Sequence, residues 1–352
     1  MHYRSIDILK LVLSFLVICI HARFQGNLGL YCLVLSRFAV PAFFIITGFF
    51  FEARYPRLNP GKTAHRYIHL IIISIVLHFV WAVYYHCLYL KEYSFSSLCM
   101  SILGGTQWGE SLFAFLAYHE LSPLLSVGHL WYLNASLYAW LIMYACRRTW
   151  GNRGRAFLCF LTPFLLLYAV IHSNYSVILL ERYIYIPHIR NYLFCGLPYM
   201  CIGSWLYTKR DTLSACFSLR FLLACIIMFS LATCIEEMAL QTVRQYVNYD
   251  YYLHTPLLAV SVFLFFLKLE PYVPKSKLLT CLAYFGKHYS SSIYLYHCLV
   301  ILISKHLLSR SRYNLLYKTY NVEPILIFFS TLLVCIMLRG AKTLISRFVA
   351  RR

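Results

Sequence analysis

Residues 6–24 read IDILKLVLSFLVICIHARF, an apolar run long enough to cross a bilayer as a helix. This run carries Asp7, Lys10 and His21 where apolar residues would be expected. Lys10 and His21 are eleven residues apart, which puts them within about 20° of each other around a helix and about 16 Å apart along its axis. Asp7 and Ser14 lie three and four residues either side of Lys10, so they share its face. Because an ionisable group is costly inside a bilayer, this stripe predicts the wall of an internal cavity.

The composition of the whole chain agrees with a membrane location. Its 352 residues are 61% hydrophobic and 12% charged, which is far from the composition of soluble domains. Long apolar runs satisfy their backbone hydrogen bonds in lipid as helices, so we expect an all-α, polytopic transmembrane helical bundle. We expect one membrane-embedded domain over residues 1–352. About ten spans are predicted, at residues 6–24, 28–52, 67–90, 129–146, 155–173, 191–208, 217–235, 251–269, 284–304 and 323–345.

The net charge of +20 reflects topology rather than nucleic-acid binding, because the basic residues lie in short loops between apolar runs. If the N-terminus is cytoplasmic, most of the 32 Lys and Arg residues fall on the cytoplasmic side, as the positive-inside rule requires. The same count places the C-terminus there as well. We therefore expect a multi-pass protein of a cell membrane, the bacterial inner membrane or a plasma membrane. Membrane lipids are expected partners and nucleic acid is not.

The cysteines predict neither a metal site nor a redox site. Fourteen are scattered along the chain, mostly within apolar runs, and no pair has the two-residue gap typical of zinc or redox motifs. In this setting cysteine behaves as a small hydrophobic residue. We therefore expect no bound metal.

Four other side chains place polar chemistry in or beside apolar runs. Arg37 lies about ten residues into the second run, where it either pairs with a carbonyl or carboxylate of the bundle or binds an anionic substrate. His129 and Trp131 open the fourth run, and an aromatic belt at the membrane surface is enough to explain the tryptophan. His297 lies deep in the ninth run, where a histidine is more often a packing residue than a catalyst.

Several short motifs in these runs resemble those of a known family. Lys10 and His21 match a first-span pattern of a basic residue, ten intervening residues and a histidine. The other matching stretches are RFAVPAFFIITGFFF at 37–51, HLWYL at 129–133, RNYLFCGLPYMCIG at 190–203 and IYLYH at 293–297. On these motifs the chain resembles integral-membrane acyltransferase family three over nearly its whole length. It departs from the family where AHRYIHLI at 64–71 has Arg66 alone in place of an arginine–any–arginine motif.

The resemblance implies a membrane O-acyltransferase. Such an enzyme would move an acyl group, in the first place acetyl, from cytoplasmic acetyl-CoA or another acyl-CoA to a hydroxyl of an extracytoplasmic glycan or cell-envelope acceptor. His21 would be the general base or a covalent acyl carrier, and Arg37 would stabilise the oxyanion or orient the donor. Acyl-CoA would be a co-substrate. The residues expected to bind the substrates are Asp7, Lys10, Ser14, Arg66, His129, Trp131 and His297.

Two other functions fit the same residues. A transporter or flippase for a lipid-linked sugar or small polar solute would use the Lys10–His21 stripe as a proton or substrate path. Against it, the sequence shows no pair of matching repeats with broken helices. A catalytically silent sensing or anchoring domain would follow if the missing arginine beside Arg66 abolished donor binding. Retention of CoA by the purified protein would separate the acyltransferase from both alternatives.

Overall fold

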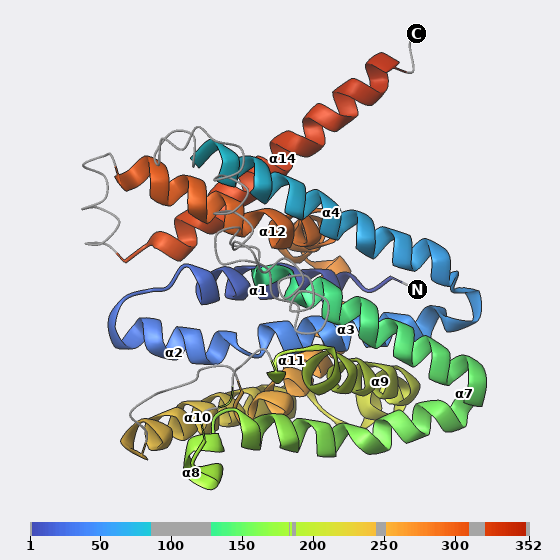
Figure 1. Cartoon of the computed structure of the whole chain (residues 1–352). Helices are drawn as coiled ribbons and strands as arrows, with labels where there is room; N and C mark the ends of the chain where they lie inside the picture. Colours follow the sequence, from blue (N-terminus) through green and yellow to red (C-terminus); the bar gives the residue numbers. More distant parts are fainter. Residues whose placement is uncertain are drawn as a thin grey trace, which may run out of the picture. The chain divides into compact units, whose positions relative to one another are not determined.

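The computed structural model of the protein describes residues 2–85, 128–182, 184, 188–243, 251–309 and 321–349. Every regular element in these ranges is a helix, which confirms the all-α class (Figure 1). The described part of the chain contains six helical segments long and apolar enough to cross a membrane, at Gly26–Arg54, Pro60–Tyr84, Trp131–His172, Leu219–Val243, Thr255–Lys275 and Glu323–Leu344. A multi-pass membrane protein is therefore supported. The number of about ten spans and the cytoplasmic termini stay predictions.

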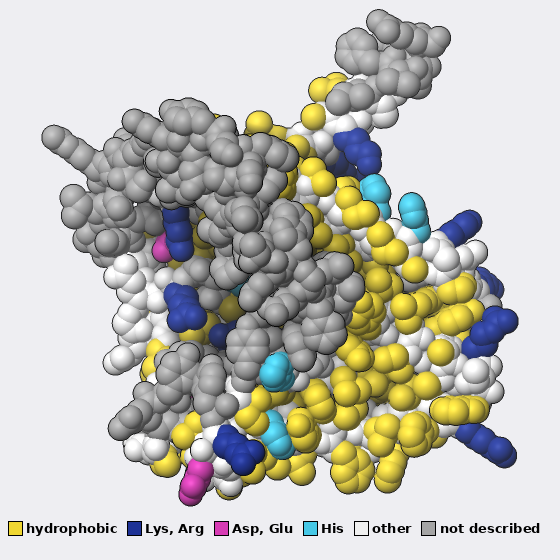
Figure 2. Space-filling model, viewed as in Figure 1, with side chains coloured by type: hydrophobic (Ala, Val, Ile, Leu, Met, Phe, Trp, Pro, Cys, Tyr) yellow, Lys and Arg dark blue, Asp and Glu magenta, His cyan; other side chains and the backbone are white. Residues whose placement is uncertain are grey.

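The exposed surface of α4 (Pro60–Tyr85) suits contact with lipid. Ile68, Ile72, Val76 and Val80 recur every four residues and are 46–59% exposed. Residues at this spacing form one stripe along a helix, and a stripe of exposed branched aliphatic side chains is unfavourable in water. Figure 2 shows apolar side chains spread over the right-hand part of the visible face, and Lys and Arg side chains both at its right-hand edge and on the left.

The contacts of the chain divide it into two compact units. Unit 1 comprises residues 37–268, and unit 2 comprises residues 2–36 together with 269–352. The prediction of a single domain is not tested by this division. The described residues of unit 2 form α1 (Arg4–His21), α2 (Gly26–Ser36), η7 (Glu270–Lys275, which begins at the unit boundary), α12 (Lys277–Ser309) and α14 (Glu323–Val349).

Unit 2 is built around the pair α1 and α12. Gly286 lies so close to the backbone carbonyl of Asp7 that a Cβ atom there would overlap it, so glycine is what allows the two helices to approach. Further along both helices, the rings of His21 and His297 are in contact. Because both contacts advance in the same direction, α1 and α12 run parallel. α14 packs against this pair, and Phe15 meets Phe328 edge-on at 5.4 Å between ring centroids.

Glu270 fixes the first turn of α1. Its carboxylate accepts hydrogen bonds from the backbone N–H groups of Arg4 (3.0 Å) and Ser5 (2.7 Å) and from the Ser5 hydroxyl (2.6 Å). These N–H groups have no partner within the helix, and a negative charge at a helix N-terminus is favourable. A residue 265 positions away thus determines where α1 begins.

Unit 1 contains the remaining described helices. They are α3 (Ala39–Arg54), η1 (Tyr55–Arg57), α4, η4 (Gly128–Leu130), α7 (Trp131–His172), α8 (Ser176–Leu180), the π-helical turn η6 (Tyr192–Gly196), α9 (Leu197–Cys216), α10 (Leu219–Val243) and α11 (Thr255–Leu269, whose last residue begins unit 2). α3 and α9 are antiparallel and in backbone contact, because Gly48 meets the Met200 carbonyl and Gly203 meets the Ile45 carbonyl.

The helices differ from the predicted spans at two places, an interruption at Arg37 and Phe38 and a bend at Gly151. The second predicted span, residues 28–52, is interrupted by a turn at Arg37 and Phe38, between α2 and α3. Pro41 contributes to this break because it has no N–H to donate to the Arg37 carbonyl. α7 covers both predicted spans 129–146 and 155–173, and Gly151 bends it with φ 55° and ψ −130°. The bend folds the two arms of α7 into a hairpin, visible in green in Figure 1.

Candidate active site

The first part of the predicted α1 stripe is a charged pair in which the carboxylate is buried and the lysine is partly exposed. Asp7 is 3% exposed; its Oδ1 accepts a 3.0 Å hydrogen bond from Lys10 Nζ, and its Oδ2 lies 2.7 Å from His2 Nε2. Ser14 is also buried and donates to the Lys10 carbonyl at 2.8 Å. The structure therefore brings Asp7, Lys10 and Ser14 together, as their spacing predicted. A buried carboxylate paired with an ammonium group costs far less than either charge alone.

The last residue of α1, His21, has a second histidine beside it. Its ring centroid lies 5.2 Å from that of His297, and the two rings are inclined at 50°. His21 is exposed, whereas His297 is fully buried in α12. The sequence predicted both residues at the site without indicating that they meet. One exposed imidazole and one buried imidazole are thus in contact at the C-terminal end of α1.

Backbone carbonyls fix the orientation of the buried ring. His297 Nδ1 lies 2.8 Å from the Tyr294 carbonyl oxygen and 3.1 Å from that of Ile293. A carbonyl only accepts, so Nδ1 carries the proton in the neutral ring and Nε2 has the lone pair. Nε2 lies 3.3 Å from Cys298 Sγ, a distance at which the thiol donates to it. The ring therefore presents a basic nitrogen away from its own helix backbone.

Arg37, His129 and Trp131 belong to unit 1, so their predicted shared site with His21 stays a prediction. Arg37 is partly buried at the turn before α3. His129 is 4% exposed, and its ring lies 5.2 Å from that of His78 in α4, which is also buried. The Arg190 guanidinium lies 5.6 Å above the Trp131 ring in a cation–π contact.

Arg66 lies on the exposed surface of α4, near the start of the helix. Arg54, Arg57 and Lys62 precede it closely in the chain and are exposed as well. Their positive charges are unscreened by any acidic side chain between residues 53 and 66, because that stretch contains none. This segment can therefore attract a polyanion, although Arg66 lacks the second arginine expected from the family pattern.

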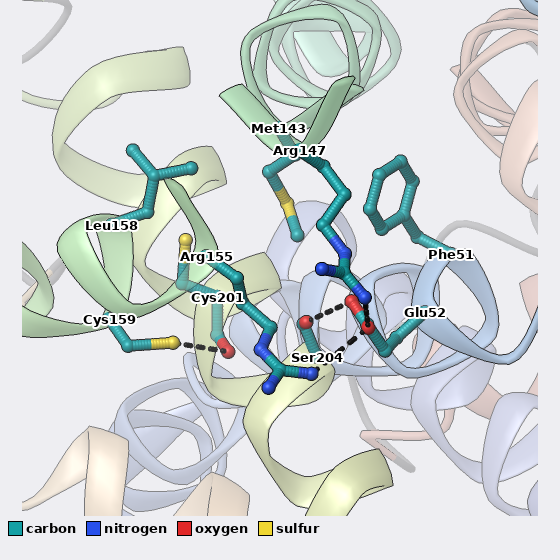
Figure 3. A pocket seen from close by; sticks show the side chains of 9 residues that line it. All are labelled: Phe51, Glu52, Met143, Arg147, Arg155, Leu158, Cys159, Cys201 and Ser204. Carbon is teal, nitrogen blue, oxygen red and sulfur yellow. Dashed lines mark hydrogen bonds and ion pairs between the residues drawn. The ribbon is translucent and has the colours of Figure 1, made fainter. Parts of the chain in front are cut away.

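A buried carboxylate, Glu52, ties the two arms of α7 to α3 (Figure 3). Its Oε1 accepts hydrogen bonds from Arg147 and Arg155, both at 3.1 Å, and its Oε2 accepts one from Ser204 at 2.7 Å. The arginines come from either side of the bend at Gly151. Figure 3 shows both guanidinium groups converging on the carboxylate in a small pocket. This arrangement is a structural ion-pair network, since both oxygens of the buried carboxylate accept hydrogen bonds from side chains of other helices.

Sequence reasoning missed three of these residues. Cys298 was treated as one of many small apolar side chains, and His78 was not singled out. Glu52 directly follows the apolar run 37–51 and was given no role, although an acid at the end of such a run is a usable signal of a buried ion pair. The partners of Glu52, the ring beside His78 and the third member of the Cys298 cluster, His21, come from other helices, and a single sequence does not show which helices meet.

The long apolar helices define a multi-pass membrane protein. The contact between His21 and His297 gives it a potential acid–base site at the C-terminal end of α1. A model of the acyltransferase domain of acyltransferase family three matches residues 3–340 of the chain. The protein therefore belongs to that family, and family membership indicates that it is a membrane acyltransferase. Comparisons with curated proteins and with solved structures gave no match.

Proposed function

We propose that the protein is an O-acyltransferase that moves an acetyl group from cytoplasmic acetyl-CoA to a hydroxyl of an extracytoplasmic carbohydrate or other cell-envelope acceptor. The contact between His21 and His297 supports this proposal most, because it supplies a reachable imidazole with a fixed partner. Transfer between compartments also explains why such chemistry is built into a membrane bundle. In this function the Asp7–Lys10 pair lies along the helix that the donor must pass.

In the proposed reaction His21 acts as the general base. It removes the proton of the acceptor hydroxyl while the hydroxyl oxygen attacks the thioester carbonyl of acetyl-CoA. The tetrahedral intermediate then expels CoA as a thiolate, which takes the proton from the His21 imidazolium. The products are the acetyl ester and free CoA, and His21 regains its starting form. A covalent acetyl-histidine is the alternative role for the same side chain.

His297 is proposed to position His21 rather than to touch the substrate. It is fully buried, and its Nδ1–H is committed to the carbonyls of Ile293 and Tyr294. Its Nε2 lone pair favours a neighbouring positive charge, so it would stabilise the imidazolium that His21 becomes during proton transfer. His297→Gln should therefore lower kcat more than it changes KM for acetyl-CoA, and it should shift the pH profile of kcat.

The donor is proposed to enter at the exposed basic segment that contains Arg54, Arg57, Lys62 and Arg66. CoA carries several phosphate charges, and arginine forms strong charge-assisted hydrogen bonds with phosphate. Arg37 remains the proposed anion-stabilising residue. His129 and Trp131 remain proposed for the acceptor, whose sugar rings could stack on the indole.

A sidedness experiment tests the proposal as a whole. Proteoliposomes hold labelled acetyl-CoA inside and a soluble glycan acceptor outside, and acetylated acceptor is measured in the external medium. The proposal predicts external product that depends on the protein and on enclosed donor. Product formed only when donor and acceptor share a compartment would contradict transfer across the membrane. If labelled donor is neither bound nor consumed, the transporter becomes the better explanation.

A further inference from the structure

Three potential metal ligands converge where α1 meets α12. His21, His297 and Cys298 each offer one ligand atom, and these atoms lie within 4.8 Å of one another. Within the cluster, Cys298 Sγ lies 3.3 Å from His297 Nε2. The cluster is the one group of this kind that the described residues contain. His21 is 276 positions from His297 in the sequence, so no local sequence motif could have revealed the cluster.

The buried histidine is already arranged as metal-binding histidines are. Such residues donate one ring N–H to a carbonyl or carboxylate, which fixes the orientation of the ring and directs the other nitrogen towards the metal. His297 does this through Nδ1, which lies 2.8 Å from the Tyr294 carbonyl oxygen. Both His297 and Cys298 are buried, at 0% and 8% exposure, so their positions are held by the surrounding side chains.

The separations fit a tetrahedral zinc ion with little movement. Zinc bonds of about 2.1 Å to nitrogen and 2.3 Å to sulfur place neighbouring ligand atoms roughly 3.4–3.6 Å apart. The Cys298–His297 separation of 3.3 Å is already close to this value. His21 is the exposed member, at the end of its helix, so its side chain can rotate to close the remaining distance.

We propose that His21, His297 and Cys298 form a binding site for a borderline or soft divalent cation, and that the bound ion is Zn²⁺. Two imidazoles and one thiolate are the donors that Zn²⁺ favours, whereas Mg²⁺ and Ca²⁺ require oxygen ligands. As the Zn–S bond forms, the Cys298 thiol releases its proton to water. The fourth position faces the exposed side of His21 and takes a water molecule.

The bound ion would inhibit the enzyme, a consequence that rests on the proposed function. Coordination uses the imidazole lone pair with which His21 would take the proton of the acceptor hydroxyl. A zinc-bound His21 therefore cannot act as base or as acyl carrier. The reaction itself requires no metal, and the cluster serves as an inhibitory site.

The binding half of the proposal is tested without turnover. Full-length protein without a polyhistidine tag is stripped with a chelator in detergent and titrated with Co²⁺, whose thiolate charge-transfer band reports a sulfur ligand. We expect one equivalent of Co²⁺ with this band, displaced by Zn²⁺. Cys298→Ser should abolish the band and weaken binding by roughly tenfold or more. Cys335→Ser, which alters another buried thiol of unit 2, should leave both unchanged.

Co²⁺ binding without the charge-transfer band, or equal affinity in wild type and Cys298→Ser, would overturn the site. The inhibitory half is tested by acetyl-CoA turnover at increasing Zn²⁺. Cys298→Ser should retain turnover and need roughly tenfold more Zn²⁺ for half-inhibition. Unaltered sensitivity in that variant would refute inhibition through this cluster. If binding follows the prediction but wild type shows no turnover at all, the metal site stands and the acyltransferase proposal fails.

Discussion

Replacing Glu52 by glutamine tests whether one buried carboxylate holds the helix hairpin of α7 against α3. The substitution keeps the size of the side chain and removes its charge. Glu52 then no longer neutralises the guanidinium groups of Arg147 and Arg155, which it binds at 3.1 Å each. The amide can still accept the hydrogen bond from Ser204. The predicted effect is therefore electrostatic.

The expected loss in the free energy of unfolding follows from how deeply the three charged groups are buried. The Glu52 side chain is 6% exposed, and those of Arg147 and Arg155 are 17% and 27% exposed. Removing one partner of a buried ion pair costs about 3–5 kcal/mol, because the charge left behind has lost its compensation. Because both arginines keep some contact with water, we expect the lower end of that range, a loss of about 3 kcal/mol in the free energy of unfolding.

Unfolding by SDS in mixed micelles, followed by circular dichroism, measures this loss. The matched control is Asp211→Asn, which also removes a carboxylate paired with an arginine at 3.2 Å, but one whose side chain is 86% exposed. An exposed pair of this kind contributes at most about 1 kcal/mol. If Glu52→Gln and the control unfold at the same SDS fraction, Glu52 does not stabilise the hairpin, and the reasoning is wrong.

Two further predictions concern helix contact and donor binding. Gly286→Leu should separate α1 from α12, because the new side chain would overlap the Asp7 carbonyl. It should therefore lower both thermal stability and turnover. The control Gly340→Ala, at a glycine with open space around it, should leave stability and turnover unchanged. Equal stability of the two variants would argue against the close contact. Arg66→Ala should raise KM for acetyl-CoA several-fold without changing stability, since Arg66 is exposed. The control Arg220→Ala, which alters another exposed arginine, should leave KM unchanged. An unchanged KM in Arg66→Ala would place donor binding elsewhere.

The positions of most helices could be read from the sequence, because a long apolar run has few alternatives to a helix in lipid. The predicted span 323–345 falls within α14, and 284–304 falls within α12. The break at Arg37 was harder to predict, since apolar residues continue on both sides of Ser36 and Arg37, and Pro41 permits a kink without requiring one. The bend at Gly151 depends on a positive φ, which glycine permits but does not require.

Contacts between helices that are far apart in the sequence could not be predicted, and this limited what the sequence showed of the candidate site. The Asp7–Lys10 pair was accessible because its members are one helical turn apart. The contact of His21 with His297 could not be predicted, because it depends on α1 and α12 lying side by side. Gly286 allows that approach, but one glycine in an apolar helix does not identify its partner. Cys298 gained significance only when the structure placed it beside His21.

The central claim is that this family member transfers an acyl group at His21, and turnover of labelled acetyl-CoA by the purified protein tests it most directly. Wild type is compared with His21→Ala and with His172→Ala, a partly buried histidine of unit 1 that stacks on Tyr168. We predict that wild type and His172→Ala release CoA and label the acceptor. His21→Ala should bind acetyl-CoA and remain folded but lose at least about a hundredfold in kcat, the lower bound for loss of a general base. Undiminished turnover in His21→Ala would contradict the account.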